Sequence, residues 1–455
     1  MAFSPLTLKE QLSGLDGVSR LVIALSGGLD SCVLLHSIIA LRDHALREQQ
    51  IFPFTIEALH VNHGLSPNAE AWERFCTRLS RSLGIPLQVV HVQIDASAGA
   101  SLENLARIKR YEAFELSLGS EDCLLMGHHL DDQAETFALR ALRGSGPKGL
   151  ASIPRRRPIG HAMILRPMLD IPRQQLSEFA VAEGLDWVED ESNERLDFDR
   201  NYLRHHVLPQ IDARWPGFAA NWARSAALCA EANKLIEEIA AQDLDACRGE
   251  SLTSLSIESI LSLSQSRQRN LIRYWVQVLD LAQPGWNTLT QIVDSLLPAK
   301  EDAQAKVSWV HQDGRIELRR FQGQLLLQQS LEPLDTTMEV QWDLQADLTL
   351  GANGVLRCQP SVGEGVSLPA GSVLTVRYRQ GGEKLRLPNR PNRPLKKILQ
   401  EAAMPPWWRE RVPLLYLDDE LVCVPGIGIA QAWKADATQD SIEFSWQAPS
   451  ALPMA

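Results

Sequence analysis

The chain has 455 residues, of which 45% are hydrophobic and 22% are charged, and its formal net charge is −11. This composition is close to that of a soluble globular protein and excludes a disordered, collagen-like or coiled-coil chain. The length suggests about two to four domains, the negative charge argues against nonspecific nucleic-acid binding, and no run of about 18 apolar residues could span a bilayer.

The cysteines and the N-terminal segment indicate the compartment. The seven cysteines are scattered and form no CxxC pair, which argues against zinc ribbons, iron–sulfur clusters and paired redox thiols. Isolated thiols buried in a reducing compartment are the simpler interpretation. The N-terminal segment lacks the basic start and apolar core of a signal peptide. We therefore expect a cytoplasmic protein with no membrane partner.

The first 216 residues alternate short apolar runs with helix-like segments. Strands are predicted at Leu21–Leu25, Phe54–Val61, Leu87–Val92 and Cys123–Met126, and helices at Ser31–Arg42, Ala69–Leu83, Leu102–Leu118 and Leu130–Leu142. A short apolar run that ends at glycines is typical of a buried parallel strand. The repeated order of strand and helix predicts an α/β domain with a doubly wound parallel sheet over residues 1–216.

The composition changes after Trp215-Pro216-Gly217. Residues 217–330 are predicted to form a mainly helical domain that ends in a small β-meander at Val307–Gln329, where Asp-Gly and Gln-Gly separate alternating segments. Residues 331–372 have little periodicity and several Gly and Pro, which is typical of a linker. Residues 373–455, with a predicted helix at Leu395–Ala403, are expected to form a small α/β C-terminal domain.

Basic residues are concentrated in two segments. From Arg377 to Arg411 there are ten Lys or Arg and three Asp or Glu. From Arg140 to Arg157 there are six basic residues and no acidic one. An acidic protein with two basic segments could bind a specific polyanion through them.

The segment SGGLDS connects the first predicted strand directly to the first predicted helix. Glycines let the backbone approach a phosphate, and the first amides of the helix point toward it with the positive end of the macrodipole. Asp30 beside a phosphate implies a Mg²⁺ between them. An ordinary strand–helix turn is the alternative, and neither GxxxxGK[ST] nor GxGxxG is present. The predicted phosphate-binding residues are Ser26, Gly27, Gly28, Leu29, Asp30 and Ser31.

This strand–SGGxDS–helix segment resembles the PP-loop (N-type) ATP pyrophosphatases. These enzymes cleave ATP between its α and β phosphates and adenylate an oxygen of the substrate. The resemblance implies ATP and Mg²⁺ as cofactors, with Asp30 as the metal ligand. The loop alone does not separate the members, because asparagine synthetases, GMP synthetases and tRNA thiolation enzymes are similar here.

Two further segments lie near the expected carboxyl edge of the sheet, where open α/β folds bind ligands. His60, Asn62 and His63 end the second predicted strand, and we expect them to frame the adenosine, although a lone histidine is more often structural. Arg107 and Arg110 are three residues apart and are expected on one helical face. A solvated surface helix would show the same spacing.

The segment GHHLDDQAET follows the fourth predicted strand. Its spacing predicts His128, Asp132 and Glu135 on one face of a helix. Carboxylates at a helix start are favoured by the macrodipole, which is the structural alternative. The functional interpretation is that they hold a cation, either Mg²⁺ or an amino-acid ammonium group. Farther on, an acidic loop at 189–193 precedes a helix that carries Arg200 and Arg204 on one face, and capping does not explain these arginines.

Together, the segments SGGLDS, HVNHGL, ENLARIKRY, GHHLDDQAET, RGSGPKGL and DESNERLDFDRNYLRHHVLP resemble the tRNA(Ile)-lysidine synthetase family. The tail contributes RYRQGGEK, LKKILQE and PWWR, so the resemblance covers most of the chain. Such enzymes ligate free lysine to carbon-2 of the wobble cytidine of the isoleucine tRNA with a CAU anticodon. The 2-oxo oxygen first attacks the α-phosphate of ATP, and the lysine ε-amine then expels AMP.

The resemblance also implies roles for residues. Asp132 and Glu135 would hold the amines of lysine, while Arg107 and Arg200 would face a carboxylate or a phosphate. Which arginine does which, and which group is the general base, stays open. Residues expected to contact lysine or tRNA are Arg110, His128, Arg143, Lys148, Arg204, Arg377, Arg379, Lys384, Lys396, Lys397 and Arg409. The first basic segment would contact the anticodon arm and the second the acceptor stem.

Other functions stay open at this point. A tRNA thiolase usually needs a pair of cysteines to relay sulfur, and Cys32 and Cys123 form no CxxC. A non-catalytic RNA-binding protein would have no need of an intact Asp30, Asp132 and Glu135. Members of the resembling family are often homodimers, so a homodimer is a further expectation, although no interface signature stands out.

Overall fold

The computed structural model of the chain describes residues 3–94, 102–191, 197–300, 304–311 and 314–449. The chain divides into two compact units, Met1–Leu235 and Ile236–Ala455. Among the described helices, none combines the length and the apolar character needed to cross a membrane.

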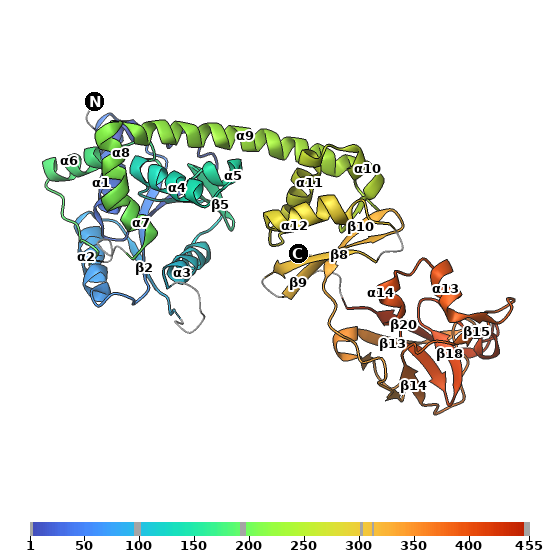
Figure 1. The fold of residues 1–455 in the computed structure, drawn as a ribbon. Coiled ribbons are helices and arrows are strands. Elements are labelled where there is room, and N and C mark those ends of the chain that lie inside the picture. Colours follow the sequence, from blue (N-terminus) through green and yellow to red (C-terminus); the bar gives the residue numbers. More distant parts are fainter. Residues whose placement is uncertain (1–2, 95–101, 192–196, 301–303, 312–313, 450–455) are drawn as a thin grey trace. The chain divides into compact units, whose positions relative to one another are not determined.

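The first unit is built on a six-stranded sheet in the order β3-β2-β1-β4-β6-β5 (Figure 1). Its strands are β1 (Arg20–Ala24), β2 (Thr55–Asn62), β3 (Leu87–His91), β4 (Asp122–Leu125), β5 (Arg156–Ile159) and β6 (Ala162–Leu165). All neighbours pair in parallel except β5, which forms an antiparallel hairpin with β6 at the sheet edge. The four predicted strands are confirmed, whereas the sequence patterns missed this hairpin.

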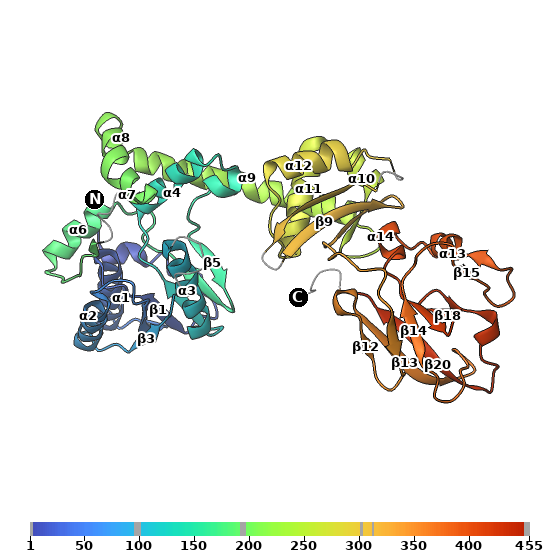
Figure 2. The ribbon, with the colours of Figure 1, turned by 60° about the horizontal axis from the view of Figure 1, so that its bottom comes forward.

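Helices cover both faces of this sheet. The helices of the unit are α1 (Leu29–Arg47), α2 (Ala69–Ser82), α3 (Leu102–Ser117), α4 (Leu130–Leu142), α5 (Pro147–Leu150), α6 (Arg173–Ala182), α7 (Asp199–Tyr202), α8 (Leu208–Arg214) and the start of α9 (Phe218–Ala246), which continues beyond Leu235 into the second unit. Because strand side chains alternate between faces, Leu21 and Ile23 lie in the core with α1 and α6. Val22 and Leu124 lie in the other core, with Phe114 of α3. Figure 2 shows α1 and α3 on opposite sides of the sheet.

The carboxyl ends of three neighbouring strands meet at one edge of the sheet. The amide of Leu25, just after β1, donates to the carbonyl of Leu59 in β2 at 2.9 Å. After β4, Gly127 lies so close to α1 that a Cβ there would be 2.9 Å from the backbone oxygen of Asp30. A glycine is therefore required at this position, and it brings the GHHLDDQAET segment against the SGGLDS loop.

The second unit begins with a helical part that covers a four-stranded antiparallel sheet in the order β7-β10-β9-β8. The helices are α10 (Ile257–Ser262), α11 (Gln265–Val278) and α12 (Trp286–Gln291), and the strands are β7 (Ser254–Ser256), β8 (Lys306–His311), β9 (Gly314–Phe321) and β10 (Gln324–Gln329). Trp275 of α11 and Leu318 of β9 are buried in their common core. The predicted meander is confirmed and gains a fourth strand, β7.

The remaining part of the second unit is rich in short strands (Figure 2). Its elements are β11 (Val340–Trp342), β12 (Leu348–Thr349), β13 (Val355–Val362), β14 (Leu374–Arg377), β15 (Lys384–Leu385), β16 (Arg393–Pro394), α13 (Leu395–Glu401), α14 (Pro406–Arg409), β17 (Leu414–Leu417), β18 (Glu420–Val424), β19 (Gly428–Ile429) and β20 (Asp440–Gln447). They form a five-stranded sheet β11-β14-β17-β18-β19, a three-stranded sheet β12-β13-β20 and the pair β15-β16.

The structure differs from the expected linker at 331–372. This stretch contains β11, β12 and β13, which pair with β14 and β20 of the C-terminal part. Leu356 of β13 is fully buried and Trp342 of β11 nearly so, both in the core of that part. The segment is therefore folded, because its apolar residues share a core with strands that follow it in the sequence.

Candidate functional site

The SGGLDS loop turns sharply between β1 and α1. Gly27 has φ +89°, a conformation that L residues rarely adopt, and a Cβ there would lie 3.0 Å from Val188 and 3.2 Å from Cys76. Gly28 caps α1, which begins at Leu29. The first amides of a 19-residue helix therefore open toward the sheet edge, an arrangement that favours an anion.

The two serine hydroxyls hold the loop in shape. Ser31 Oγ accepts from the Gly27 amide at 3.2 Å and donates to the Gly28 carbonyl at 2.9 Å. Ser26 Oγ accepts from the Gly28 amide at 3.3 Å and lies 3.1 Å from Ser31 Oγ. Ser31 and Leu29 are buried, whereas Ser26 is exposed. Ser26 is thus the hydroxyl best placed to meet a ligand, and Leu29 contributes only backbone.

Asp30, on the first turn of α1, fits a metal ion. Its Oδ1 atom is buried and has no hydrogen-bond partner in the described part of the chain, with Arg173 Nε 3.9 Å away. Within that part, no three His, Cys, Asp or Glu side chains come together as a complete metal site. One carboxylate with waters and phosphate oxygens is a common arrangement for Mg²⁺.

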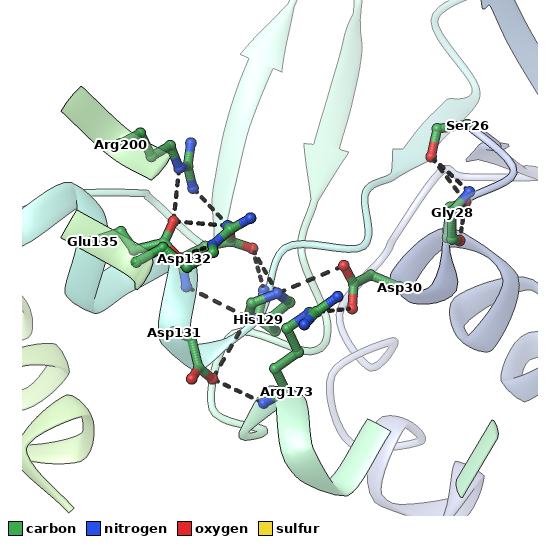
Figure 3. A network of polar contacts seen from close by, with 11 residues as sticks. Ser26, Gly28, Asp30, His129, Asp131, Asp132, Glu135, Arg173 and Arg200 are labelled. Atoms are coloured by element: carbon green, nitrogen blue, oxygen red, sulfur yellow. Dashed lines mark hydrogen bonds and ion pairs between the residues drawn. The ribbon is translucent and has the colours of Figure 1, made fainter. Parts of the chain in front are cut away.

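His129 connects the loop to the next acidic residue (Figure 3). Its Nε2 lies 3.6 Å from Asp30 Oδ2 and 3.5 Å from Asp132 Oδ2. The imidazole is almost fully buried and caps α4, where Asp132 in turn accepts from the His129 amide at 3.0 Å. Burial lowers the pKa of His129, but Asp30 and Asp132 outweigh this effect and raise it. The ring therefore lies between two carboxylates, and its Nε2 faces both.

Two arginines neutralise the carboxylates of α4. Arg200 donates to Asp132 at 2.6 Å and to Glu135 at 2.7 Å. Arg204 donates to both oxygens of Glu135, at 2.5 and 2.9 Å. Glu135 is 1% exposed. Burial lowers the pKa of Arg204, but its bond to Glu135 outweighs burial and raises it. Arg200 comes from a short helix, α7, and Arg204 from the π-helical turn that follows it (Leu203–Val207).

His128 does not share the helix face that its spacing predicts. The helix α4 begins only at Leu130, with His129 as its cap, so His128 precedes it. Its Nδ1 is buried without a hydrogen-bond partner in the described part. Burial lowers the pKa of His128 to about 3, and the nearby charges of Arg166, Arg200 and Arg107 act in the same direction. This histidine is therefore neutral beside the site.

The residues expected to frame the adenosine have protein partners. His60 is buried, and its Nδ1 lies 2.8 Å from the Leu25 carbonyl, so it supports the start of the loop. Asn62 donates to Glu73 at 2.7 Å and accepts from the Gly64 amide. Burial lowers the pKa of His60. These contacts assign both side chains to holding the sheet edge.

The two arginines of α3 have different surroundings, and only Arg110 acts on His63. Burial lowers the pKa of His63, and the charge of Arg110 lowers it further, so these two side chains are neighbours. Arg107 instead lies over the ring of Tyr111, 5.2 Å from its centroid. The two arginines were expected on one helical face, but their side chains have different neighbours, Tyr111 for Arg107 and His63 for Arg110.

The first basic segment lies after α4. Arg143 is exposed and forms an ion pair with Asp199 at 3.4 Å. Lys148, on α5, is also exposed. Of the predicted acidic loop 189–193, Ser192 and Asn193 lie outside the described residues.

The second basic segment divides into paired and solvent-facing residues. Arg377 lies 3.0 Å from Glu339 and stacks over Tyr416, and Arg379 lies 3.7 Å from Glu383. Arg409 donates to the Met404 carbonyl at 2.7 Å. Among the described residues, no acidic side chain lies within ion-pair distance of Lys384, Lys396 or Lys397, which are all exposed. These three lysines are best placed to meet a polyanion.

Sequence reasoning missed two contributors to the site. Although His129 stands within the GHHLDDQAET segment, its capping role was unexpected because histidine is an uncommon cap. Arg173, the first residue of α6, approaches Asp30 and donates its amide to Asp131 at 2.8 Å. No local motif marks Arg173, because only the fold brings α6 to α4.

The arrangement combines two chemical capacities. The SGGLDS loop and Asp30 can receive phosphates and a divalent cation. Asp132 and Glu135 lie next to them and are paired with Arg200 and Arg204. A site of this kind can activate an oxygen with a nucleoside triphosphate and then bring an amine to the activated centre.

Comparison with known proteins agrees with this division. A PP-loop domain matches residues 6–211, a TilS substrate binding domain 255–326 and a TilS substrate C-terminal domain 374–446. The tRNA(Ile)-lysidine synthase of Coxiella burnetii is 39% identical over 447 residues, which cover 98% of this chain and 96% of that protein. That of Serratia proteamaculans is 37% identical over 444 residues, covering 97% and 98%.

Proposed function

The chain belongs to the tRNA(Ile)-lysidine synthase family, an ATP-dependent ligase family, and we propose that it joins free lysine to carbon-2 of the wobble cytidine of the CAU-anticodon isoleucine tRNA. The observation that carries the proposal is the contact chain from Asp30 through His129 to Asp132, with steps of 3.6 and 3.5 Å. It places a phosphate site beside a carboxylate that can hold an amine.

The first step is adenylation of the cytidine. The 2-oxo oxygen attacks the α-phosphorus of ATP, a phosphorus–oxygen bond forms, and pyrophosphate leaves. The amides at the start of α1 and the Ser26 hydroxyl stabilise the charge that develops on the phosphate. Asp30 would hold a Mg²⁺, which neutralises phosphate charge when it is bound.

Lysine binding then requires an exchange of partners. Glu135 is 1% exposed and accepts three hydrogen bonds from arginines, so it is the fixed carboxylate. Asp132 is more accessible, with 12% of its side chain exposed, and it accepts one close arginine bond, from Arg200. We infer that a lysine ammonium group replaces Arg200 at Asp132. The released guanidinium can then face a carboxylate or phosphate.

The second step transfers the amine. The ε-nitrogen, having lost a proton, attacks carbon-2, the bond from carbon-2 to the adenylated oxygen breaks, and AMP leaves with that oxygen. The target base must leave its stack to reach the site. The basic segments from Arg140 to Arg157 and from Arg377 to Arg411 would hold the anticodon arm and phosphates elsewhere on the tRNA, the acceptor stem among them.

A tRNA thiolase is less well supported. Cys32 and Cys123 are both buried, and burial raises the pKa of each to about 12. A sulfur relay needs an accessible thiolate. A homodimer and a cytoplasmic location, where ATP, lysine and tRNA meet, complete the proposal, and sedimentation of the purified chain would test the homodimer.

The test is a reaction of the full chain with ATP, Mg²⁺, radiolabelled lysine and a transcript of the isoleucine tRNA. Label enters the tRNA in the proposed reaction and stays out when the wobble cytidine is replaced by uridine. Pyrophosphate release without label would refute lysine as the nucleophile. Absence of both from a folded sample that binds the tRNA would favour a non-catalytic RNA-binding protein.

A further inference from the structure

A cavity of about 490 Å³ lies between α3 and the edge strand β5, on the face of the sheet opposite α1. Arg107, Tyr111, Glu112 and Glu115 line it from α3, and Arg157 lines it from β5. Of the two carboxylates, Glu112 is paired with Lys109 at 2.7 Å. At the hairpin turn, Gly160 allows close contact, since a Cβ there would lie 2.9 Å from Glu115. The cavity is large enough for one nucleotide.

Two arginines of this cavity have no acidic partner. The guanidinium groups of Arg107 and Arg157 lie 5.2 and 4.5 Å from the centroid of the Tyr111 ring. Both side chains are exposed, and no carboxylate within the described ranges forms an ion pair with either. The neighbouring arginines behave differently, because Arg155 pairs with Asp170 and Arg156 donates to backbone carbonyls of the N-terminal segment.

A third guanidinium lies at the same tyrosine. Arg166 is 2% exposed, and its Nε has no hydrogen-bond partner in the described part. Burial raises the pKa of Tyr111, but the charges of Arg107, Arg166 and Arg157 outweigh burial and lower it. Unpaired positive charge around a partly buried hydroxyl favours an anion.

The cavity is joined to the candidate site through one residue. Met126 directly follows β4, and its sulfur lies 3.8 Å from the Tyr111 hydroxyl and 3.9 Å from Arg166 Nη2. The next residues are Gly127 and His128, and the charges of Arg166 and Arg107 lower the pKa of His128. A group bound in the cavity would therefore lie next to the reacting centre.

We propose that this cavity binds a nucleotide flanking the target cytidine, with its phosphate on Arg107 and Arg157 and its base or sugar against Tyr111. This proposal rests on the proposed function. Guanidinium groups suit phosphate oxygens, and aromatic rings with arginines are typical of single-stranded RNA contacts. The exposure of both arginines and the size of the cavity favour a polymer over the small carboxylate of free lysine.

The test uses Arg157→Gln, with Arg47→Gln as a control of equal charge change. Arg47 is exposed at the C-terminal end of α1, away from the phosphate loop. Affinity for the isoleucine tRNA is measured by fluorescence anisotropy over a range of salt concentrations, and the KM values for tRNA, lysine and ATP are measured separately. Tyr111→Phe tests the hydroxyl while keeping the ring.

With Arg157→Gln we expect the tRNA dissociation constant to rise about ten-fold and the salt slope to shrink by about 0.7 to 0.9, as for one lost phosphate contact. The KM values for lysine and ATP should be unchanged, and Arg47→Gln should match the wild type. A raised KM for lysine at unchanged tRNA affinity, or no change at all, would overturn the proposal. Anisotropy needs no turnover, so a wild type that binds tRNA but adds no lysine would refute the proposed function alone.

Discussion

Arg200 Nη2 lies 2.6 Å from Oδ1 of Asp132, so the carboxylate proposed to receive a substrate amine has a cationic partner already. The pKa of Asp132 is raised by burial, but the charges of His129 and Arg200 outweigh burial and lower it. The carboxylate is therefore ionised before lysine binds. In this account, lysine competes with an arginine for a prepared anion.

Asp132→Asn removes this anion and nearly preserves its shape. We expect kcat/KM for lysine to fall about 100-fold, which corresponds to about 2.8 kcal/mol, because the ammonium loses its charged partner while Arg200 keeps Glu135. The dissociation constant for ATP should change little. Steady-state kinetics with labelled lysine measures the first quantity and calorimetry the second.

Asp199→Asn is the matched control for this variant. Asp199 is next to Arg200 in the sequence, but it is exposed and pairs with Arg143 at the surface. Its loss should leave kcat/KM for lysine within about two-fold, as expected for a weak surface pair. An equal loss in both variants would mean that the Asp132 result reflects overall charge.

Asp30→Asn tests the metal assignment. The amide keeps one oxygen but loses the charge that would bind Mg²⁺, so the Mg²⁺ concentration that supports half-maximal pyrophosphate release should rise at least about ten-fold. The measurement is a Mg²⁺ titration at saturating ATP and tRNA. Asp43→Asn, on the exposed side of the same helix, should leave the titration unchanged, and an unchanged titration with Asp30→Asn would refute the assignment.

Gly27→Ala tests the geometry of the phosphate loop, with Gly84→Ala as its control. Both glycines have positive φ, +89° and +66°, but a Cβ at Gly84 meets nothing within 4 Å. The free energy of unfolding of the control should fall only by the cost of a side chain at positive φ, about 1 kcal/mol. The free energy of unfolding should fall further in Gly27→Ala, because Val188 and Cys76 must shift. This variant should also bind ATP more weakly. Chemical denaturation and calorimetry would show both effects, and equal losses would mean that the loop tolerates a side chain.

Much of the catalytic fold follows from local patterns. The four apolar runs predict β1 to β4 within two residues of their observed ends, because buried parallel strands require continuous apolar sequence. The hairpin β5–β6 was missed because Arg156–Ile159 is half basic and contains Pro158, as an edge strand allows. Residues 331–372 resembled a linker because β11 and β12 are only three and two residues long, while the longer β13 contains Pro360 and pairs with the distant β20.

The sequence indicated which residues form the candidate site better than it indicated which residues contact one another. Spacing correctly brought Arg200 and Arg204 together, but it could not show that Glu135 would hold both. The common face of His128 with α4 was wrong because the helix starts two residues later, at Leu130, with His129 as its cap. Contacts of this kind depend on tertiary packing, which a single sequence does not display.

Asp122 should make the stability of the chain depend on acidic pH. It accepts two bonds from Arg20 and one from the Gly119 amide, and the hydrogen bonds from Arg20 keep its pKa below the ordinary value. A lowered pKa stabilises the fold above the unfolded pKa of about 3.9, and this stabilisation is lost as pH falls through the folded value. Asp122→Asn should therefore cost about 2 kcal/mol at pH 7 and progressively less below about pH 4.

Denaturant unfolding of both proteins between pH 3 and pH 7 would measure this difference. The difference in free energy of unfolding between wild type and Asp122→Asn should shrink toward acid. A difference that widened toward acid would mean that the Asp122 pKa is raised in the folded state. Glu57, which also pairs with Arg20, stays present in both proteins.

The most direct measurement of the central claim follows one oxygen atom. The isoleucine tRNA is prepared with ¹⁸O at the 2-oxo position of its wobble cytidine and reacted with ATP, Mg²⁺ and lysine, and the AMP is analysed by mass spectrometry. If that oxygen attacks the α-phosphate and lysine then displaces it, ¹⁸O appears in AMP and leaves the tRNA. Unlabelled AMP, with ¹⁸O retained in the tRNA, would contradict the adenylated cytidine and the role assigned to this site.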